Sequence, residues 1–336
     1  LFSTLENLSM KKTLIALAAV AATSAAFAQS TVTLSGSLDV GIVRNGAAGT
    51  TVLNAAGNGL NQLVFSGSED LGGGLKANFV LQQRFNPTSG QNDGTNAGRR
   101  TFQGASTVGL SGGFGNIRLG REIEAFNDVN NWADPWGTVR AASIAFAAGN
   151  AAYGPDAADL GRTEGIHYNS PSFGGVSLGL TYGFKDQTAP QIGGAAYAVG
   201  KTKSFFSGNL MYSGGPLTAY VGVLQNRYDD EGYVIGAGYN LGVAHLKFAY
   251  TDIDGVAGGS VANADEYKGY QLSAEVPLGA TVVSVGYLND KTNGVKSNKL
   301  GLGAQYNLSK RTALIATYGK VKATKANFDF SVRHTF

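Results

Sequence analysis

The sequence predicts an all-β protein, a 16-stranded antiparallel transmembrane β-barrel, and three observations lead to this prediction. Glycine and aromatic residues are abundant, with 49 Gly, 17 Phe and 15 Tyr in 336 residues, while only 15% of residues are charged. Apolar and polar residues alternate along most of the chain. Short glycine-rich connections alternate with long polar ones, which is typical of a barrel whose two rims differ.

The composition also excludes several classes of protein. A hydrophobic content of 43% is too high for a disordered chain. The absence of cysteine excludes a disulfide scaffold, a thiolate metal site and a cysteine nucleophile. A formal charge of +3 is too small to indicate a nucleic-acid partner, which normally requires a dense basic face.

The N-terminus reads as a targeting segment. Met10-Lys11-Lys12 begins a short basic stretch, an apolar run of small residues follows, and Ala26-Phe27-Ala28 supplies a small-x-small cleavage pattern. The apolar run is too short for a spanning helix, which needs about 20 residues. We therefore expect an over-extended start over residues 1–9, a signal peptide over residues 10–28, and a mature β-barrel over residues 29–336.

The mature chain alternates with a period of two, so each strand has one apolar and one polar face. The first such run is Val32–Ile42, and the last sets Phe328, Phe330, Val332, His334 and Phe336 against polar residues. Counting the runs between connections gives sixteen strands. The long connections are expected at 44–60, 86–98, 122–161, 186–200 and 253–265.

A β-sandwich would also show alternation, because it too has one buried face. Two features favour a membrane barrel instead. Tyrosines lie near the ends of many runs, as in the aromatic girdles of outer-membrane barrels, and the polar faces are rich in Gly, Ser, Thr, Asn and Gln. Lipid offers no partner for a free backbone edge, so such a sheet must close on itself.

Six short strings carry a resemblance to a known family. They are Gly67–Ala77, Val108–Gly115, Leu119–Arg121, Tyr168–Gly175, Leu308–Thr312 and Arg333–Phe336, in that order along the chain. Together they resemble the Gram-negative general porins of the betaproteobacterial type. The resemblance implies a homotrimer in the cell outer membrane, among lipid and lipopolysaccharide, whose third loop folds inward and narrows the pore. It also implies that the terminal Phe336 serves as an assembly signal.

A barrel of this size leaves an aqueous channel, so we expect passive diffusion of small hydrophilic solutes and inorganic ions, and no enzymatic activity. The longest connection, about 122–161, has the position and length of the family's constriction loop. Its acidic residues Glu122, Glu124, Asp128 and Asp134 are expected to face a basic wall formed by Arg84, Arg118, Arg162 and Arg100. Acids opposite bases would set a transverse field across the narrowest section.

Selectivity is expected to be weakly to moderately anionic. Inward-facing strand charges lean basic: Lys76, Arg84, Arg118, Lys247, Lys299 and Arg333 stand against Asp39, Glu275 and Asp329. However, places where the family commonly carries arginine read Gln62, Ser66 and Gly104 here. A substrate-specific channel with a saturable site in the constriction loop, formed with Trp132 and Trp136, is the alternative.

Other chemistry finds little support in the sequence. The three histidines are far apart and no Gly-x-Ser-x-Gly motif accompanies them, which disfavours a rim protease. No cofactor and no metal site are expected, although Glu69-Asp70 and Asp229-Asp230-Glu231 could offer oxygen ligands to a divalent cation. A secreted adhesin or lectin would share the signal peptide but would need no aromatic girdles.

Overall fold

The computed structural model describes residues 31–46, 48–55, 61–92, 101–146, 162–184, 203–226, 230–256 and 264–336. The signal peptide expected at 10–28, the segment 1–9 and Arg100 lie outside the described residues. Within the described part of the chain, no helix is long and apolar enough to cross a membrane.

The described residues form one antiparallel sheet and one short helix, α2 (Ala125–Asn130). The strands are β1 (Thr31–Asn45), β2 (Thr50–Ala55), β3 (Gln62–Gly72), β4 (Leu75–Arg84), β5 (Ala105–Gly112), β6 (Gly115–Ile123), β7 (Arg162–Asn169), β8 (Val176–Gly183), β9 (Phe205–Gly214), β10 (Leu217–Gln225), β11 (Glu231–Asn240), β12 (His245–Val256), β13 (Ala264–Leu278), β14 (Thr281–Thr292), β15 (Val295–Asn307), β16 (Thr312–Val321) and β17 (Asn327–Thr335).

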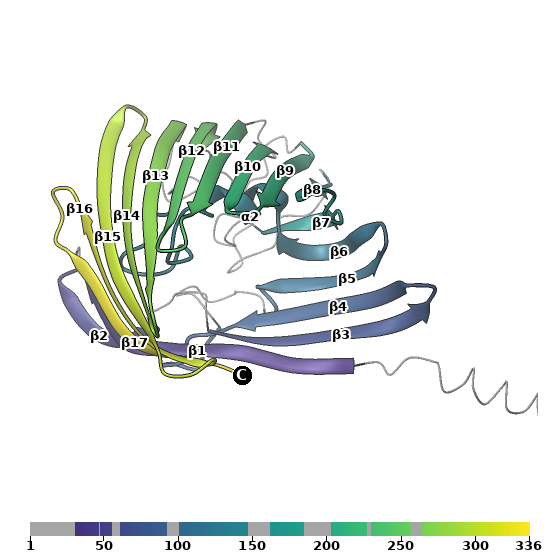
Figure 1. Cartoon of the computed structure of the whole chain (residues 1–336), viewed down its shortest axis with the longest axis horizontal. Coiled ribbons are helices and arrows are strands. Elements are labelled where there is room, and N and C mark those ends of the chain that lie inside the picture. Colours follow the sequence, from purple (N-terminus) through teal and green to yellow (C-terminus); the bar gives the residue numbers. More distant parts are fainter. Residues whose placement is uncertain are drawn as a thin grey trace, which may run out of the picture.

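The sheet closes on itself between its first and last strands. β1 pairs with β17 along one edge, and β2 and β3 follow one another along the other edge of β1. β2 and β3 pair with successive parts of β1 and thus count as one strand position around the barrel. The seventeen strands therefore fill sixteen positions, and the predicted sixteen-stranded closed barrel is confirmed. In Figure 1 the purple β1 lies beside the yellow β17. A β-sandwich is excluded by this closure. The connection expected over 44–60 is correct only in part, because β2 occupies its middle.

The two faces of the barrel follow the alternation in the sequence. On β17, Phe328, Phe330 and Val332 are exposed, whereas Asp329 and Ser331 are buried. We call the face that carries the exposed apolar side chains the outer face, and the face that carries Asp329 and Ser331 the lumen face. Exposed tyrosines on the outer face lie near both rims: Tyr212, Tyr239 and Tyr306 near the short turns, and Tyr182, Tyr233 and Tyr318 near the other end.

The short turns depend on glycine where the sequence indicated. Between β3 and β4, Gly73 and Gly74 take φ values of 61° and 80°. L-residues with a side chain rarely adopt these values, so glycine closes the hairpin without strain.

The buried apolar cluster lies on the lumen face rather than between two sheets. It joins Phe126, Val129, Ala133, Ile144 and Phe146 of the β6–β7 connection to wall side chains of β9–β14. The wall contributes Phe205, Tyr220, Leu224, Val234, Ala249, Ile253, Tyr267 and Leu288. Burial of this apolar surface holds the connection against one side of the barrel.

Candidate functional site

Residues 124–146, the described part of the β6–β7 connection after β6, begin with the helix α2. Glu124 is its N-cap: one carboxylate oxygen accepts from the Phe126 amide at 2.8 Å and the other from the Asn127 amide at 2.8 Å. These bonds satisfy amides that a helix start leaves without intrahelical partners. Glu124 is fully buried, so this acid works as a structural cap.

The segment 124–146 then follows the lumen face from β8 toward β17. The Ala125 amide donates to Thr181 Oγ1 of β8 at 3.0 Å, and Asn209 of β9 donates to the Ala125 carbonyl at 2.6 Å. Further along, Ser273 of β13 donates to the Ala133 carbonyl at 2.6 Å, and Gln271 of the same strand donates to the Ile144 carbonyl at 2.9 Å. Wall side chains therefore satisfy backbone groups of the segment.

Wall glycines make room for the two tryptophans of this segment. A Cβ placed on Gly238 would come within 2.5 Å of the Trp132 ring, and one on Gly303 within 2.5 Å of Trp136 Nε1. A Cβ on Gly319 would overlap the Ala141 carbonyl oxygen. Both tryptophans thus pack the segment against the wall, which disfavours their use in the saturable solute site that the sequence left open as the alternative.

The far end of the segment is held by a buried cluster of charges. Arg140 forms ion pairs with Asp39 of β1 and with Asp329 of β17, the latter at 3.2 Å, and its Nη1 also donates to Ser331 Oγ at 2.8 Å. The Ala141 amide adds a bond to Asp329 at 2.7 Å. Here a base on the segment meets acids on the wall, the reverse of the arrangement expected from the sequence.

The sequence contained the signal for this clamp. Asp39 and Asp329 share the inward parity, and their strands are neighbours because the first and last strands must meet when the barrel closes. Arg140 is the one base among the charges of the expected constriction loop. Only the closed fold shows that the three residues meet.

Asp134 has a structural place within the segment. It is buried and accepts bonds from the amides of Thr138 at 2.9 Å, Trp136 at 3.2 Å and Ile144 at 3.2 Å, and from Ser143 Oγ at 2.5 Å. Burial raises the pKa of Asp134, and these hydrogen bonds lower it in part. The carboxylate therefore folds residues 134–144 onto themselves and does not face the opposite wall.

Arg118, Glu122 and Asp128 form the one cluster in which predicted acids meet a predicted base in the described chain. Arg118 Nε lies 2.5 Å from a Glu122 carboxylate oxygen, and Nη2 donates to Asn169 Oδ1 at 2.7 Å. Desolvation by the surrounding protein raises the pKa of Asp128 to about 7, although part of the residue stays exposed to solvent. Repulsion from Glu124 and then Glu122 adds to the shift, and Arg118 opposes it.

The other predicted bases lie elsewhere. Arg84 is the last residue of β4 and lies on the same face as Gln82. On the same strand, Asn78 is six residues away and shares a cross-strand row with Arg118. At about 3.3 Å per residue the two positions are roughly 20 Å apart along the strand direction. Arg162 begins β7 on the parity of the exposed Ile166, is itself buried, and donates to the Gly104 carbonyl. The structure therefore does not join Arg84 or Arg162 to the Arg118 cluster.

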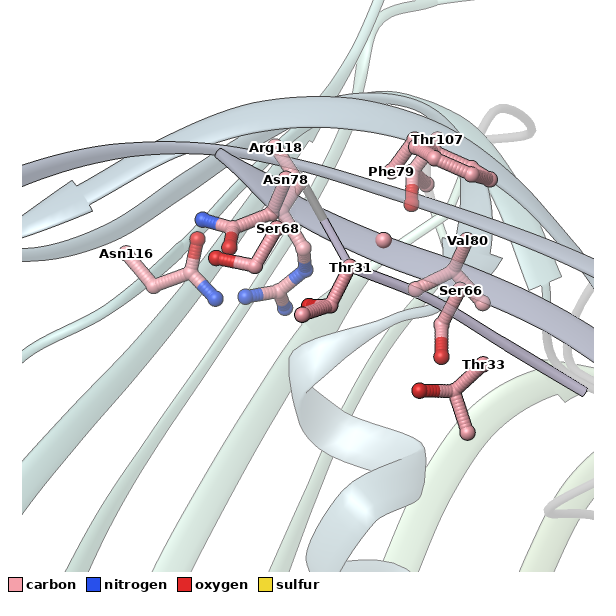
Figure 2. Close-up of a pocket in the computed structure, with 11 residues that line it drawn as sticks. Thr31, Thr33, Ser66, Ser68, Asn78, Phe79, Val80, Thr107, Asn116 and Arg118 are labelled. Atoms are coloured by element: carbon pink, nitrogen blue, oxygen red, sulfur yellow. The ribbon is translucent and has the colours of Figure 1, made fainter. Parts of the chain in front are cut away.

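The sequence did not single out a cavity that borders Arg118 on the lumen face. Its volume is about 320 Å³, and β1 and β3–β6 line it. Figure 2 shows the Arg118 guanidinium together with the polar ends of Asn116, Ser68 and Thr31 in this region. Its signal in the sequence is a set of Thr, Ser and Asn residues on the inward parity of these strands. The lining residues are Thr31, Thr33, Ser66, Gly67, Ser68, Asn78, Phe79, Val80, Thr107, Asn116 and Arg118.

Two further sites considered from sequence can be placed. Phe336 lies at the β1–β17 seam, where its amide and carbonyl each bond to Gly36 at 3.0 Å. In the described residues, no group of three or more His, Asp or Glu side chains could hold a metal ion. Asp70 instead accepts from the Gly72 amide at 2.8 Å within its turn. Asp229 lies outside the described residues.

Comparison with known proteins agrees with this architecture. A family model for Gram-negative porins matches residues 14–326. Outer membrane porin protein 32 of Delftia acidovorans is 35% identical over 335 residues, covering 95% of this chain and 91% of that protein. Among solved structures, an anion-selective porin from Comamonas acidovorans has a TM-score of 0.74 at 28% identity, covering 92% of this chain and all of that chain.

A more distant structure shares the fold alone. In-vitro folded OmpT of Vibrio cholerae, described as a trimer form, has a TM-score of 0.65 at 13% identity and covers 91% of this chain and 99% of that chain. A closed sixteen-stranded barrel, a match over most of the chain and a relative above 30% identity together identify the family. The chain belongs to the Gram-negative porins, which are outer-membrane channels rather than enzymes.

Proposed function

We propose that this porin conducts small hydrophilic solutes and inorganic ions by passive diffusion, with a weak to moderate preference for anions. One observation carries the proposal: the contacts of residues 124–146 run along β8–β17 and β1, while polar side chains line the lumen face of β3–β6. The route for solutes then lies between this segment and the β3–β6 wall. The segment acts as the constriction loop, proposed over about 122–161.

The pairing of charges supports the anion preference. The wall acids Asp39 and Asp329 are engaged by Arg140, and Glu275 lies 2.5 Å from Lys247 Nζ. The remaining inward bases on the strands are Lys76, Arg84, Arg118, Lys299 and Arg333. Arg118 is balanced in part by Glu122 and Asp128, and the other four bases keep the field in the lumen modestly positive.

The partners of the porin are also part of the proposal. We propose a homotrimer, supported by the trimer form of a barrel with the same fold. Outer-membrane lipid and lipopolysaccharide would surround the outer face, whose exposed Phe, Leu, Val and Ile side chains suit a hydrocarbon environment. Phe336, at the seam of the barrel, is the proposed assembly signal.

Reversal potentials test the selectivity. The purified protein is inserted in a planar bilayer under a tenfold KCl gradient. The current through the wild type is expected to reverse at a potential whose sign is that of the chloride equilibrium potential. Arg118→Gln should move the potential toward zero, because it removes a lumen charge. Arg311→Gln, which changes an exposed base in the β15–β16 turn, is the matched control and should change the potential less. A cation-selective wild type would refute the anion preference, and a folded protein without conductance would refute the pore.

A further inference from the structure

Polar residues and one glycine line up across five strands of the lumen face, and the row ends at Arg118. Thr31 of β1 is the cross-strand partner of Ser68 of β3, and Ser68 is the partner of Asn78 of β4. Asn78 pairs with Gly109 of β5, which in turn pairs with Arg118 of β6. Adjacent strands lie about 4.8 Å apart, so these residues form one continuous row. We call Thr31, Ser68, Asn78 and Arg118, with Asn116 beside them, the hydroxyl-amide row.

Glycine in the middle of this row lets the arginine reach its neighbours. A Cβ on Gly109 would come within 2.9 Å of Arg118 Cγ, so the arginine side chain lies over the position that a larger residue would fill. Figure 2 shows its guanidinium near Ser68 and Thr31, which belong to other strands.

The protein itself uses only part of the hydrogen-bonding capacity of the row, for example where Asn78 Nδ2 donates to Ser111 Oγ at 2.8 Å. Arg118 offers five N–H groups, and its bonds to Glu122 and Asn169 in the described part of the chain engage only Nε and Nη2. Among the described residues, the side chains of Thr31 and Ser68 make no hydrogen bond. Asn116 Oδ1 is buried and likewise has no partner there. The hydroxyl groups of Thr31 and Ser68 and the unused N–H groups of Arg118 therefore stand side by side, available to water or to a solute.

A second row extends the same chemistry. Thr33 pairs with Ser66, and their strand neighbours along the sheet are Val80 and Thr107. All four line the same cavity of about 320 Å³, which is near the lower end of the volumes of small-molecule sites.

The charge balance indicates what kind of solute fits. Of the described residues that line the cavity, Arg118 alone is charged, and it is already paired with Glu122 at 2.5 Å. Asp128 also interacts electrostatically with Arg118. Because Glu122 already balances the guanidinium charge, a carboxylate or phosphate would gain little from it. A neutral molecule with many hydroxyl groups could instead donate to the hydroxyls of Thr31 and Ser68 and accept from the unused N–H groups of Arg118.

We propose that the hydroxyl-amide row is a weak, saturable binding site for neutral polyhydroxylated solutes, of the monosaccharide or polyol class, on the lumen wall opposite residues 124–146. The inference rests on the proposed pore function and deepens it. Solutes of this class would exchange their hydrogen bonds to water for bonds to the row, pause there, and reduce the ion current while bound.

Ion current in the presence of glucose tests the proposal. Single-channel conductance in KCl is recorded against glucose concentration, and a polyethylene glycol of similar size corrects for volume and viscosity. Glucose is expected to reduce the current with saturation, and gluconate, its anionic counterpart, is expected to block less. The double variant Ser68→Ala/Asn116→Ala should raise the half-blocking glucose concentration by about tenfold, since it removes two hydrogen-bonding groups.

Matched variants separate the row from the rest of the lumen. Ser284→Ala changes a lumen-face serine on β14, away from this cavity, and should leave the glucose block unchanged. Should the double variant fail to fold, the single variant Ser66→Ala is used, with an expected increase of about fivefold. Unblocked KCl conductance reports in each case that the pore is intact.

Several results would overturn the proposal. A current that falls linearly, as with the polyethylene glycol, means that there is no site. A saturable block that survives the double variant places the site elsewhere, and a stronger block by gluconate means that the row selects anions. In all three cases the KCl conductance stays normal, so the pore function stands. Absence of any conductance in the folded wild type would instead refute the pore itself.

Discussion

The buried clamp at Arg140 gives the sharpest test of how the β6–β7 connection is held. In Arg140→Met the long apolar side chain remains, but Asp39 and Asp329 lose their cation. The side chains of all three residues are almost completely buried, with 3%, 0% and 1% of their surface exposed, so water screens the change little. Removing one partner of a buried ion pair costs about 3–5 kcal/mol.

The cost falls first on the contact between residues 124–146 and the β1–β17 seam. At about 1.4 kcal/mol per factor of ten, 3–5 kcal/mol raises the population of the detached segment by roughly two to four orders of magnitude. The absence of cysteine from the chain allows a single reporter, Ala142→Cys, at a position that is fully buried. Maleimide labelling of this thiol requires detachment, so the Arg140→Met background should label correspondingly faster.

A charge-balanced variant provides the control. Arg140→Met combined with Asp39→Asn and Asp329→Asn removes both signs of charge, so no carboxylate is left buried without a cation. Labelling should then slow down again relative to Arg140→Met alone. An unchanged labelling rate in Arg140→Met would refute the clamp, and a triple variant that labels as fast as Arg140→Met would refute the electrostatic explanation of it.

Three other predictions follow from the lumen and the seam. The pKa of Asp128 near 7 means that this carboxyl gains its negative charge as pH rises through neutrality, so the anion preference should decrease between pH 6 and 8. Reversal potentials should show a smaller decrease in Asp128→Asn, and equal decreases would contradict the assignment. Gly319→Ala should change single-channel conductance by displacing the segment, whereas Gly113→Ala, whose Cβ meets open space, should not; identical conductance traces would count against the packing. Deletion of Phe336 should lower the folded fraction recovered from outer membranes several-fold in a heat-modifiability gel, and normal recovery would argue against an assembly role.

The charged residues of the candidate site differ in how far the sequence alone predicts their positions and roles. The shared face of Arg118 and Glu122 could be predicted, because both lie on one strand at positions of the same parity. Their contact could not, because four residues of strand separate the two positions by roughly 13 Å. The structural roles of Glu124 and Asp134 could not. A carboxylate in a long connection can cap a helix or close a turn as readily as face a wall, and backbone geometry decides between these.

The strand period, the glycine turns and the aromatic residues near strand ends determined the barrel by themselves, since local alternation fixes which side chains face lipid. The six family strings added the identity of the barrel. The tertiary structure alone decided where residues 124–146 lie, because that depends on contacts between segments far apart in the chain. Examples are the ion pairs of Arg140 with Asp39 and Asp329, and the packing of Trp132 and Trp136 against glycines of the wall. It also decided that the hydroxyl-amide row is continuous, because cross-strand register, which no single strand encodes, brings Thr31, Ser68 and Arg118 onto one line.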